Sequence, residues 1–92
     1  MKDFCRVKIV VNGDVQGVFF RYSAKRKAEE LSITGFVKNL FDGKVEIVAE
    51  GDKENLQKLI AWAQVGPPSA RVTSCETEWH DATGEFREFF VE

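Results

Sequence analysis

The first regular pattern in the chain is an alternation of apolar and polar side chains over residues 5–11. A period of two places successive side chains on opposite faces of a strand. The two faces carry, respectively, Cys5, Val7, Ile9 and Val11, and Arg6, Lys8 and Val10. We therefore predict a strand here that buries one face and exposes most of the other.

Two later segments have the spacing of amphipathic helices. Residues 21–32 place Ala24, Ala28 and Leu31 on one face, with charged residues outside. In residues 53–64, four apolar side chains recur at i, i+3, i+4 and i+7, namely Leu56, Leu59, Ile60 and Ala63. Asp52 is a suitable N-cap for this second helix, and Gly66-Pro67-Pro68 would end it.

The remaining apolar runs are short and are separated by turn residues. They predict four further strands, over residues 35–41, 44–50, 70–79 and 86–91. Asp42-Gly43 predicts a tight hairpin turn between the first two of these. In the last strand we expect Phe89 and Val91 to face the core.

The resulting order is β-α-β-β-α-β followed by a short terminal strand. We predict an α+β fold of the ferredoxin-like split βαβ type, in which an antiparallel sheet of four to five strands carries two helices on one face. The length of 92 residues fits one small domain, which we take as residues 1–92. This fold hosts unrelated functions, so the function has to be argued from a site.

Composition and charge limit the classes of function. Apolar residues make up 43% of the chain, which is enough for a core without a metal or a disulfide as a staple. The net charge of −2 argues against a nucleic-acid partner. Neither a membrane span nor a signal peptide is visible, so we expect a cytoplasmic protein. Cys5 and Cys75 lack metal-type spacing; we expect two thiols, although a disulfide between them stays open at this stage.

The charge is unevenly divided along the chain. Residues 1–45 carry a net charge of +4 and residues 46–92 a net charge of −6. A basic N-terminal half would attract an anionic ligand. Ordinary scatter of surface charge is the alternative explanation.

The segment from Gly13 to Arg21 carries the strongest chemical signal. It joins the first predicted strand to the first predicted helix and contains Gly13 and Gly17. Free N–H groups at a helix N-terminus bind anions, and an arginine offers a fork of donors suited to phosphate. We therefore predict a phosphate cradle. The alternative is that both glycines merely permit positive φ in a turn and that Arg21 is a solvated residue.

Asn39 is a second candidate. It lies in a predicted strand, where asparagine is depleted, three residues before the Asp42-Gly43 turn. In the predicted sheet its strand can lie near the Gly13–Arg21 loop, where an amide could hold a water molecule beside a phosphoryl group. A hairpin without any chemical role would explain the neighbouring glycines but explains Asn39 poorly.

Two long motifs resemble the signatures of the acylphosphatase family. The first is Val11-x-Gly13-x-Val15-Gln16-Gly17-Val18-x-Phe20-Arg21. The second is Gly35-Phe36-Val37-Lys38-Asn39-x-x-x-Gly43-x-Val45, which continues to Gly51. Both are matched in order and at the expected separation, and the resemblance extends over essentially the whole chain, including Ser69-Ala70-Arg71-Val72.

The resemblance implies a role for each matched position. Arg21 resembles the arginine that binds the phosphate group together with loop amides, which here belong to Val15, Gln16, Gly17, Val18, Phe19 and Phe20. Asn39 resembles the asparagine that orients the attacking water, and Thr34 resembles a supporting position near the site. Asp14 stands at a variable position, and we expect its carboxylate to point to solvent.

The implied activity is hydrolysis of acyl phosphates to a carboxylate and inorganic phosphate, without a metal or another cofactor. The expected partners are small-molecule acyl phosphates and the expected state is a monomer. His80, the only histidine, lies in a predicted acidic turn and is not expected to act in catalysis. The alternatives are a non-catalytic module of the same fold that binds phosphate or acyl phosphates, and an RNA-binding domain. The third predicted strand lacks the aromatic side chains that an RNA-binding domain would need.

Overall fold

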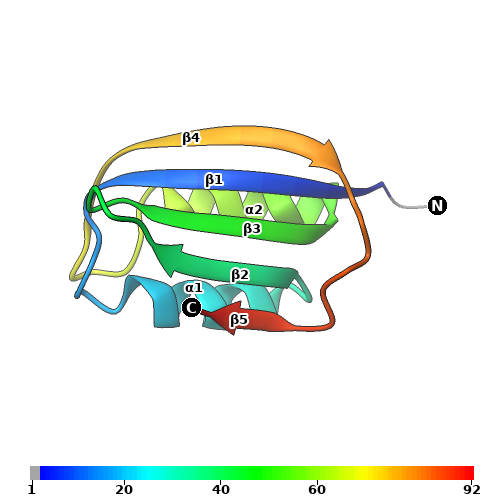
Figure 1. Ribbon diagram of the computed structural model, residues 1–92, viewed down its shortest axis with the longest axis horizontal. Helices are drawn as coiled ribbons and strands as arrows, with labels where there is room; N and C mark the ends of the chain where they lie inside the picture. Colours follow the sequence, from blue (N-terminus) through cyan, green and yellow to red (C-terminus); the bar gives the residue numbers. More distant parts are fainter. Residues whose placement is uncertain (1–2) are drawn as a thin grey trace.

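The computed structural model describes residues 3–92 and contains a five-stranded sheet with two helices on one face (Figure 1). The strands are β1 (Phe4–Asp14), β2 (Thr34–Asn39), β3 (Val45–Asp52), β4 (Arg71–Asp81) and β5 (Phe89–Val91), and the helices are α1 (Phe20–Glu30) and α2 (Lys53–Ala63). The order across the sheet is β4-β1-β3-β2-β5. Every predicted element is present, and the ferredoxin-like arrangement is confirmed.

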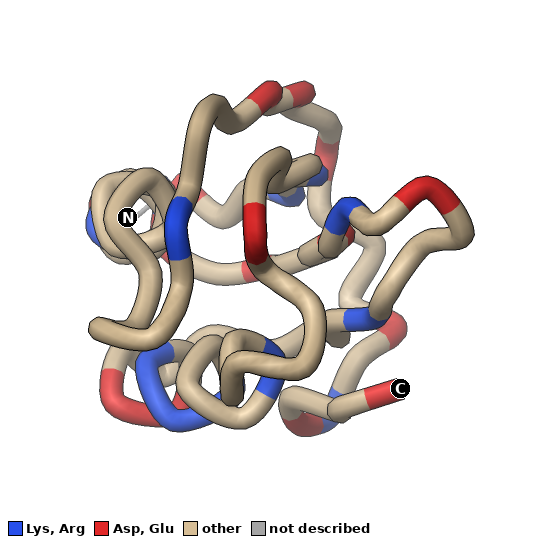
Figure 2. Tube along the Cα trace, turned by 90° about the vertical axis from the view of Figure 1, so that its left-hand side faces the viewer, with Lys and Arg blue, Asp and Glu red and all other residues tan. Residues whose placement is uncertain are grey.

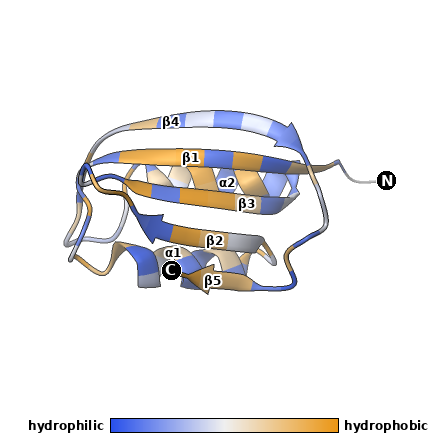
Figure 3. Ribbon diagram, in the orientation of Figure 1, coloured by the Kyte–Doolittle hydropathy of each residue, from blue (hydrophilic) through white to orange (hydrophobic). Residues whose placement is uncertain are grey.

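The core lies between the sheet and the helices. Of the inward residues predicted for the first strand, Val7, Ile9 and Val11 are fully buried, whereas Cys5 is half-buried. They pack in one cluster with the inward residues of β3 and the apolar faces of the helices, among them Ala24 and Leu56. Figure 3 shows the same division, because the central strands β1 and β3 are largely apolar, whereas the edge strand β4 is mostly polar. The period of two in strands and 3.6 in helices therefore places the apolar side chains in this core.

The sheet is mixed, whereas the sequence predicted an antiparallel one. β1, β2, β3 and β4 form antiparallel pairs, but β5 pairs with β2 in parallel, from Gly35 opposite Phe89 to Val37 opposite Val91. The direction follows from the path of the chain. β4 ends beside the start of β1, and the next residues cross to the opposite edge of the sheet and arrive where β2 begins. From there the last strand can only run in the direction of β2.

The last strand is also shorter than predicted. It spans Phe89–Val91 in place of residues 86–91, because residues 82–88 form the crossing connection. Phe89 faces the core as predicted and is 1% exposed, but Val91, predicted to face the core, is 43% exposed. The prediction for Val91 is therefore wrong, because Val91 borders a pocket beside the first residues of α1 instead of lying in the core.

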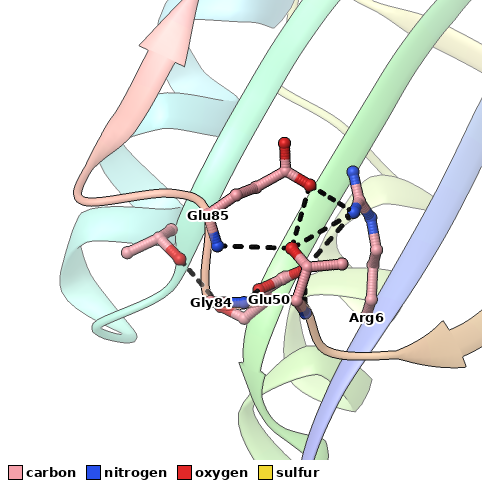
Figure 4. Close-up of polar contacts among 6 residues, drawn as sticks. Arg6, Glu50, Gly84 and Glu85 are labelled. Atoms are coloured by element: carbon pink, nitrogen blue, oxygen red, sulfur yellow. Dashed lines mark hydrogen bonds and ion pairs between the residues drawn. The ribbon is translucent and has the colours of Figure 1, made fainter.

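The crossing connection is held by the carboxylate of Glu50, the one buried charged residue in the described chain (Figure 4). Its oxygens accept hydrogen bonds from the amide groups of Thr83 and Gly84 and from the Thr83 hydroxyl, each at 2.9 Å. The Arg6 guanidinium lies 3.5 Å from Glu50 and 2.8 Å from Glu85. Burial alone raises the pKa of Glu50, but these donors and the Arg6 charge outweigh it and hold the pKa below its usual range.

The two halves of the chain interleave, and this changes the meaning of their opposite charges. Across the sheet, strands from residues 1–45 alternate with strands from residues 46–92. Basic side chains of the first half consequently pair with acids of the second, as Lys8 and Lys38 do with Glu46 at 3.6 and 3.7 Å. The uneven charge along the sequence therefore does not separate into one basic half and one acidic half of the molecule.

The two cysteines are free thiols. Cys5 lies opposite Asp81 in the β1–β4 ladder, whereas Cys75 lies opposite Val11. Six strand positions, about 20 Å at the rise of an extended chain, therefore separate them along the ladder, which is too far for a disulfide.

Candidate active site

A pocket of about 300 Å³ opens at the end of the sheet where β1 leads into α1 and where β2 ends. Figure 2 looks onto this end of the molecule. The described residues that line the pocket are Val15, Gly17, Phe19, Phe20, Arg21, Tyr22, Asn39 and Val91. The structure thus brings together the two candidate residues, Arg21 and Asn39, which lie on different elements and are 18 residues apart in the sequence.

The loop between β1 and α1 supplies backbone to this pocket. Gly17 has φ of 73° and Phe19, which occupies the N-cap position of α1, has φ of 65°. Residues with left-handed conformations turn the chain sharply, and such turns can gather successive N–H groups on one side to form an anion-binding concavity. The loop therefore has a backbone suited to a phosphate cradle.

The N-terminus of α1 lacks the usual compensating groups. The side chain of the N-cap residue, Phe19, makes no capping hydrogen bond, and the first turn of α1 carries no acidic residue. By contrast, α2 has Glu54 in its first turn. A helix N-terminus carries partial positive charge and unpaired N–H groups, and a cation in the first turn adds to that charge. Arg21 is such a cation, so this end of α1 is electrostatically prepared for an anion from outside the helix.

The C-terminal residues hold Arg21 in place. Its Nη1 donates a hydrogen bond to the main-chain oxygen of Glu92 at 2.5 Å. The Glu92 amide in turn donates to the Val37 carbonyl at 2.9 Å, which attaches it to β2. One nitrogen of the guanidinium is therefore fixed by main chain, while the side chain still lines the pocket. This contact was not predicted from the sequence, because it joins residues 71 positions apart and uses the main chain of Glu92.

Two side chains brace the loop from behind. Gln16 Nε2 donates to the carbonyls of Leu40 and Lys44 at 2.7 and 2.9 Å, and Ser69 Oγ donates to the Val18 carbonyl at 2.6 Å. The side chains of Gln16 and Val18 are accordingly not among those that line the pocket. The prediction that Gln16 and Val18 bind phosphate applies to their main-chain amides and not to their side chains. In the sequence, the only sign of this brace was the polar Gln16 between Val15 and Gly17 in the first motif.

Asn39 ends β2 and pairs with Val45 at the start of β3. Asn39 lines the pocket, so this end of β2 lies near the loop, as predicted. The adjoining turn is stabilised by Asp42, whose carboxylate accepts a hydrogen bond from the Lys44 amide at 3.2 Å. That hydrogen bond holds the pKa of Asp42 below its usual value. The turn and the Gln16 brace therefore share the main chain of Lys44, which couples the hairpin to the loop.

Three other residues named in the sequence analysis lie outside the pocket. Thr34 begins β2 and pairs with Glu50, about 17 Å along the strand from Asn39 at the rise of an extended chain. The structure therefore does not bring Thr34 near the site. Asp14 is exposed, as expected, and pairs with Arg71 on the β4 side. His80 lies near the opposite end of the sheet, where its Nε2 is 2.6 Å from Glu78, and it belongs to β4 and not to a turn.

The charge and ligand chemistry of the pocket are simple. Among its described lining residues Arg21 alone carries a charge. Within residues 3–92 no three or more His, Cys, Asp or Glu side chains gather in a way that could hold a metal ion. The polar groups on hand are thus backbone N–H donors, one guanidinium, one carboxamide and the hydroxyl of Tyr22. They can bind an anion and position a neutral polar molecule beside it.

Comparison with known proteins gives a consistent family. The model of the Acylphosphatase family matches residues 7–91. An acylphosphatase of Methylococcus capsulatus is 56% identical over 86 residues, which cover 94% of each chain. The crystal structure of the Bacillus subtilis acylphosphatase superimposes with a TM-score of 0.92 at 34% identity, covering 96% of this chain and 98% of that one. HypF of T. kodakarensis contains a similar unit, with a TM-score of 0.78 and 36% identity over all of this chain but 12% of its own.

Within residues 3–92 no helix has both the length and the apolar character that crossing a membrane requires.

Proposed function

This chain belongs to the acylphosphatase family, and we propose that it hydrolyses the carboxyl–phosphate bond of acyl phosphates in the pocket between β1, α1 and β2. The products are a carboxylate and inorganic phosphate. The observation that carries the assignment of the site is the meeting of three groups in one pocket. These are the uncapped N-terminus of α1, the Arg21 side chain and Asn39.

The phosphate group is bound by the loop and by Arg21. In this proposal the main-chain amides of residues 15–20 donate to the phosphoryl oxygens, and the guanidinium donates from the mouth of the pocket. Charge-assisted bonds of this kind are stronger than neutral ones, and arginine suits phosphate geometry. The same donors stabilise the charge on the equatorial oxygens in the transition state. Because the contact with Glu92 fixes one guanidinium nitrogen in advance, Arg21 loses little freedom when the substrate binds.

Asn39 positions the water. Its carboxamide would hold a water molecule in line with the bond between phosphorus and the acyl oxygen. Water attacks phosphorus, the bond to the acyl oxygen breaks, and the carboxylate departs with the electron pair. The proton of the attacking water passes to a phosphoryl oxygen of the substrate, so no side chain has to act as a general base. A carboxylate is a good leaving group, so positioning and charge stabilisation supply most of what catalysis requires.

The test compares three variants in the hydrolysis of benzoyl phosphate, followed by ultraviolet absorbance. Asn39→Ala should lower kcat by about a hundredfold to a thousandfold, the usual loss when one preorganised polar group is removed. Its affinity for inorganic phosphate should change little. Arg21→Ala should lower both kcat and phosphate affinity, because the charge acts on ground state and transition state alike. His80→Ala is the control and should keep the wild-type rate, with or without a chelator.

Three results would contradict the proposal. Near-normal turnover in Asn39→Ala would remove the water-positioning role. A folded wild type that binds phosphate without turnover would identify a phosphate-binding module of this fold, comparable in size to the similar unit within HypF. A large loss of kcat in His80→Ala, or in the wild type with a chelator, would rule out a mechanism that uses neither a metal nor a histidine.

We also propose an oligomeric state and a cellular location for the enzyme. A monomer is proposed as the active state, because Arg21, Asn39 and the loop amides supply every group that the scheme uses. Small secreted domains are usually held by disulfides, whereas residues 3–92 contain none, which supports a cytoplasmic location. No second molecule is needed besides the acyl phosphate and water, so residues 1–92 would act as one unit without a cofactor or nucleic acid.

A further inference from the structure

Large apolar side chains are exposed around the pocket. Phe19 is 75% exposed, Tyr22 is 60% exposed and Val91 is 43% exposed, and all three line it. We call these three residues the apolar rim. Single exposed apolar residues are ordinary on protein surfaces, but a group of them around a pocket marks a place where a ligand or partner is bound. The rim adjoins Arg21 and Asn39, so the bound molecule shares the pocket with the phosphate.

Phe19 is the least expected member of this rim. Its φ of 65° lies in the left-handed region, which is disfavoured for residues other than glycine, asparagine and aspartate. Its side chain is mostly exposed, so packing in the core does not explain why a phenylalanine stands there. By contrast, the neighbouring Phe20 is 1% exposed and packs against Trp62 with ring centroids 5.2 Å apart. The benzyl group of Phe19 therefore has no visible structural task and is available to a ligand.

The charge of the pocket limits what that ligand can be. Arg21 is its one charged lining residue among those described, and it is needed for the phosphate. One of its guanidinium nitrogens is also engaged with the main-chain oxygen of Glu92. A second anionic group on the substrate would therefore lie against the apolar rim without a cation, where the loss of its hydration is not repaid.

From these observations we infer that the apolar rim binds the acyl end of the substrate, so that the enzyme prefers acyl phosphates with uncharged apolar acyl groups. This inference rests on the proposed function, because it places the phosphate on the loop and Arg21. Burial of an aromatic or branched acyl group against Phe19, Tyr22 and Val91 removes apolar surface of both partners from water. Small acyl groups gain little from this contact, and carboxylate-bearing acyl groups are disfavoured by it.

The experiment compares kcat/KM for benzoyl, acetyl and succinyl phosphate. Benzoate and acetate are leaving groups of similar acidity, so the benzoyl-to-acetyl ratio reports mainly on contacts with the acyl group. We expect kcat/KM of the wild type to fall from benzoyl to acetyl to succinyl phosphate, with a benzoyl-to-acetyl ratio of about tenfold or more. Phe19→Asn suits the left-handed backbone but removes the phenyl ring, and Tyr22→Ala removes the second ring. Each should lower that ratio by roughly fivefold.

Phe4→Ala is the matched control. Phe4 is also a largely exposed phenylalanine, but it begins β1 at the end of the sheet opposite the pocket. Its replacement should leave the benzoyl-to-acetyl ratio unchanged. Phe19→Leu, which keeps apolar surface at the rim, should retain more of the ratio than Phe19→Asn. A general weakening of the phosphate loop would lower kcat/KM for both substrates and would not move the ratio.

The failure of this inference differs from the failure of the proposed function. Wild-type turnover with a ratio near one, or a ratio that the Phe19 and Tyr22 variants do not change, would overturn the acyl role of the rim and leave the hydrolase site standing. An equal effect of Phe4→Ala would overturn it as well. Loss of turnover with all three substrates in the folded wild type would remove the proposed function itself, and this inference with it.

Discussion

Gly13 shows how one residue positions the loop between β1 and α1. It lies in β1 where the register with β4 shifts, just before the loop, and its φ is 131°. A β-carbon added there would lie 2.1 Å from the main-chain oxygen of Arg71. The glycine thus allows β1 and β4 to approach closely at the point where the chain leaves the sheet. The loop begins from this fixed position.

We predict that Gly13→Ala lowers the free energy of unfolding by more than about 2 kcal/mol, because backbone atoms of β4 would have to move. Gly17→Ala is the comparison, since φ is again positive, at 73°, but no atom lies within 4 Å of an added β-carbon. It should cost only the conformational penalty of about 1 kcal/mol. Urea denaturation of both variants measures the difference. Equal losses would show that the close approach to β4 contributes nothing.

The sequence was informative about residues whose chemistry is unusual for their place. An arginine in a first helical turn and an asparagine in a strand were recognisable, and the structure brings both to one pocket. The brace of Gln16 and the contact of Arg21 with Glu92 were not predicted. Both end on main-chain oxygens, and every residue has such an acceptor. The side-chain pattern therefore cannot reveal which carbonyl will be chosen.

The crossing connection of residues 82–88 is the element that depends most on one charge. It carries the chain from β4 at one edge of the sheet to β5 at the other, and Glu50 of β3 accepts three hydrogen bonds from it. The Glu50 side chain is 4% exposed, so these bonds are sheltered from solvent (Figure 4). Arg6 is the cation that faces it, and Arg6 also binds Glu85 on the connection.

We predict that protonation of Glu50 destabilises the protein. Because its pKa is lower in the folded state than the ordinary value of 4.5, its stabilising effect is complete above about pH 4.5 and is lost as the pH falls below that value. Glu50→Gln should reduce the free energy of unfolding at pH 7 by about 1–3 kcal/mol, since the charged acceptor is replaced. It should also flatten the acid limb of stability measured by urea denaturation between pH 7 and 3. An acid limb as steep as that of the wild type would contradict this role.

The element pattern was predicted well because it depends on local periodicity. The order of strands and helices, the position of the hairpin and the apolar face of α2 all follow from residues close in the sequence. The turn itself is wider than the predicted tight turn at Asp42-Gly43, because β2 ends at Asn39 and β3 begins at Val45. The parallel direction of β5 and the shortening of that strand were not predicted. They depend on a connection held by Glu50, whose partners lie more than 30 residues away. A period of two over residues 86–91 could not distinguish a strand from an extended connection.

At the scale of the whole molecule, the two polar sites lie at opposite ends of the sheet. Asn39 pairs with Val45 at one end of β3, and Glu50 lies five residues further along that strand, about 17 Å away. Substitutions at sites separated by such distances and without shared partners act almost independently. The end with the pocket can therefore be specialised for binding while the Glu50 end secures the fold.

This separation leads to a prediction about stability with ligand. Inorganic phosphate, a product of the reaction, should bind the folded loop and raise the free energy of unfolding, by about 2.7 kcal/mol at a concentration a hundredfold above its Kd. Arg21→Ala should lose most of this increment. Glu50→Gln should lower the stability without ligand but keep the full increment, because its partners are at the other end of the sheet. Thermal unfolding with and without phosphate, against sodium chloride at equal ionic strength, measures both. An increment that chloride reproduces, or one that Arg21→Ala retains, would mean that the anion acts on general surface charge and not in the pocket.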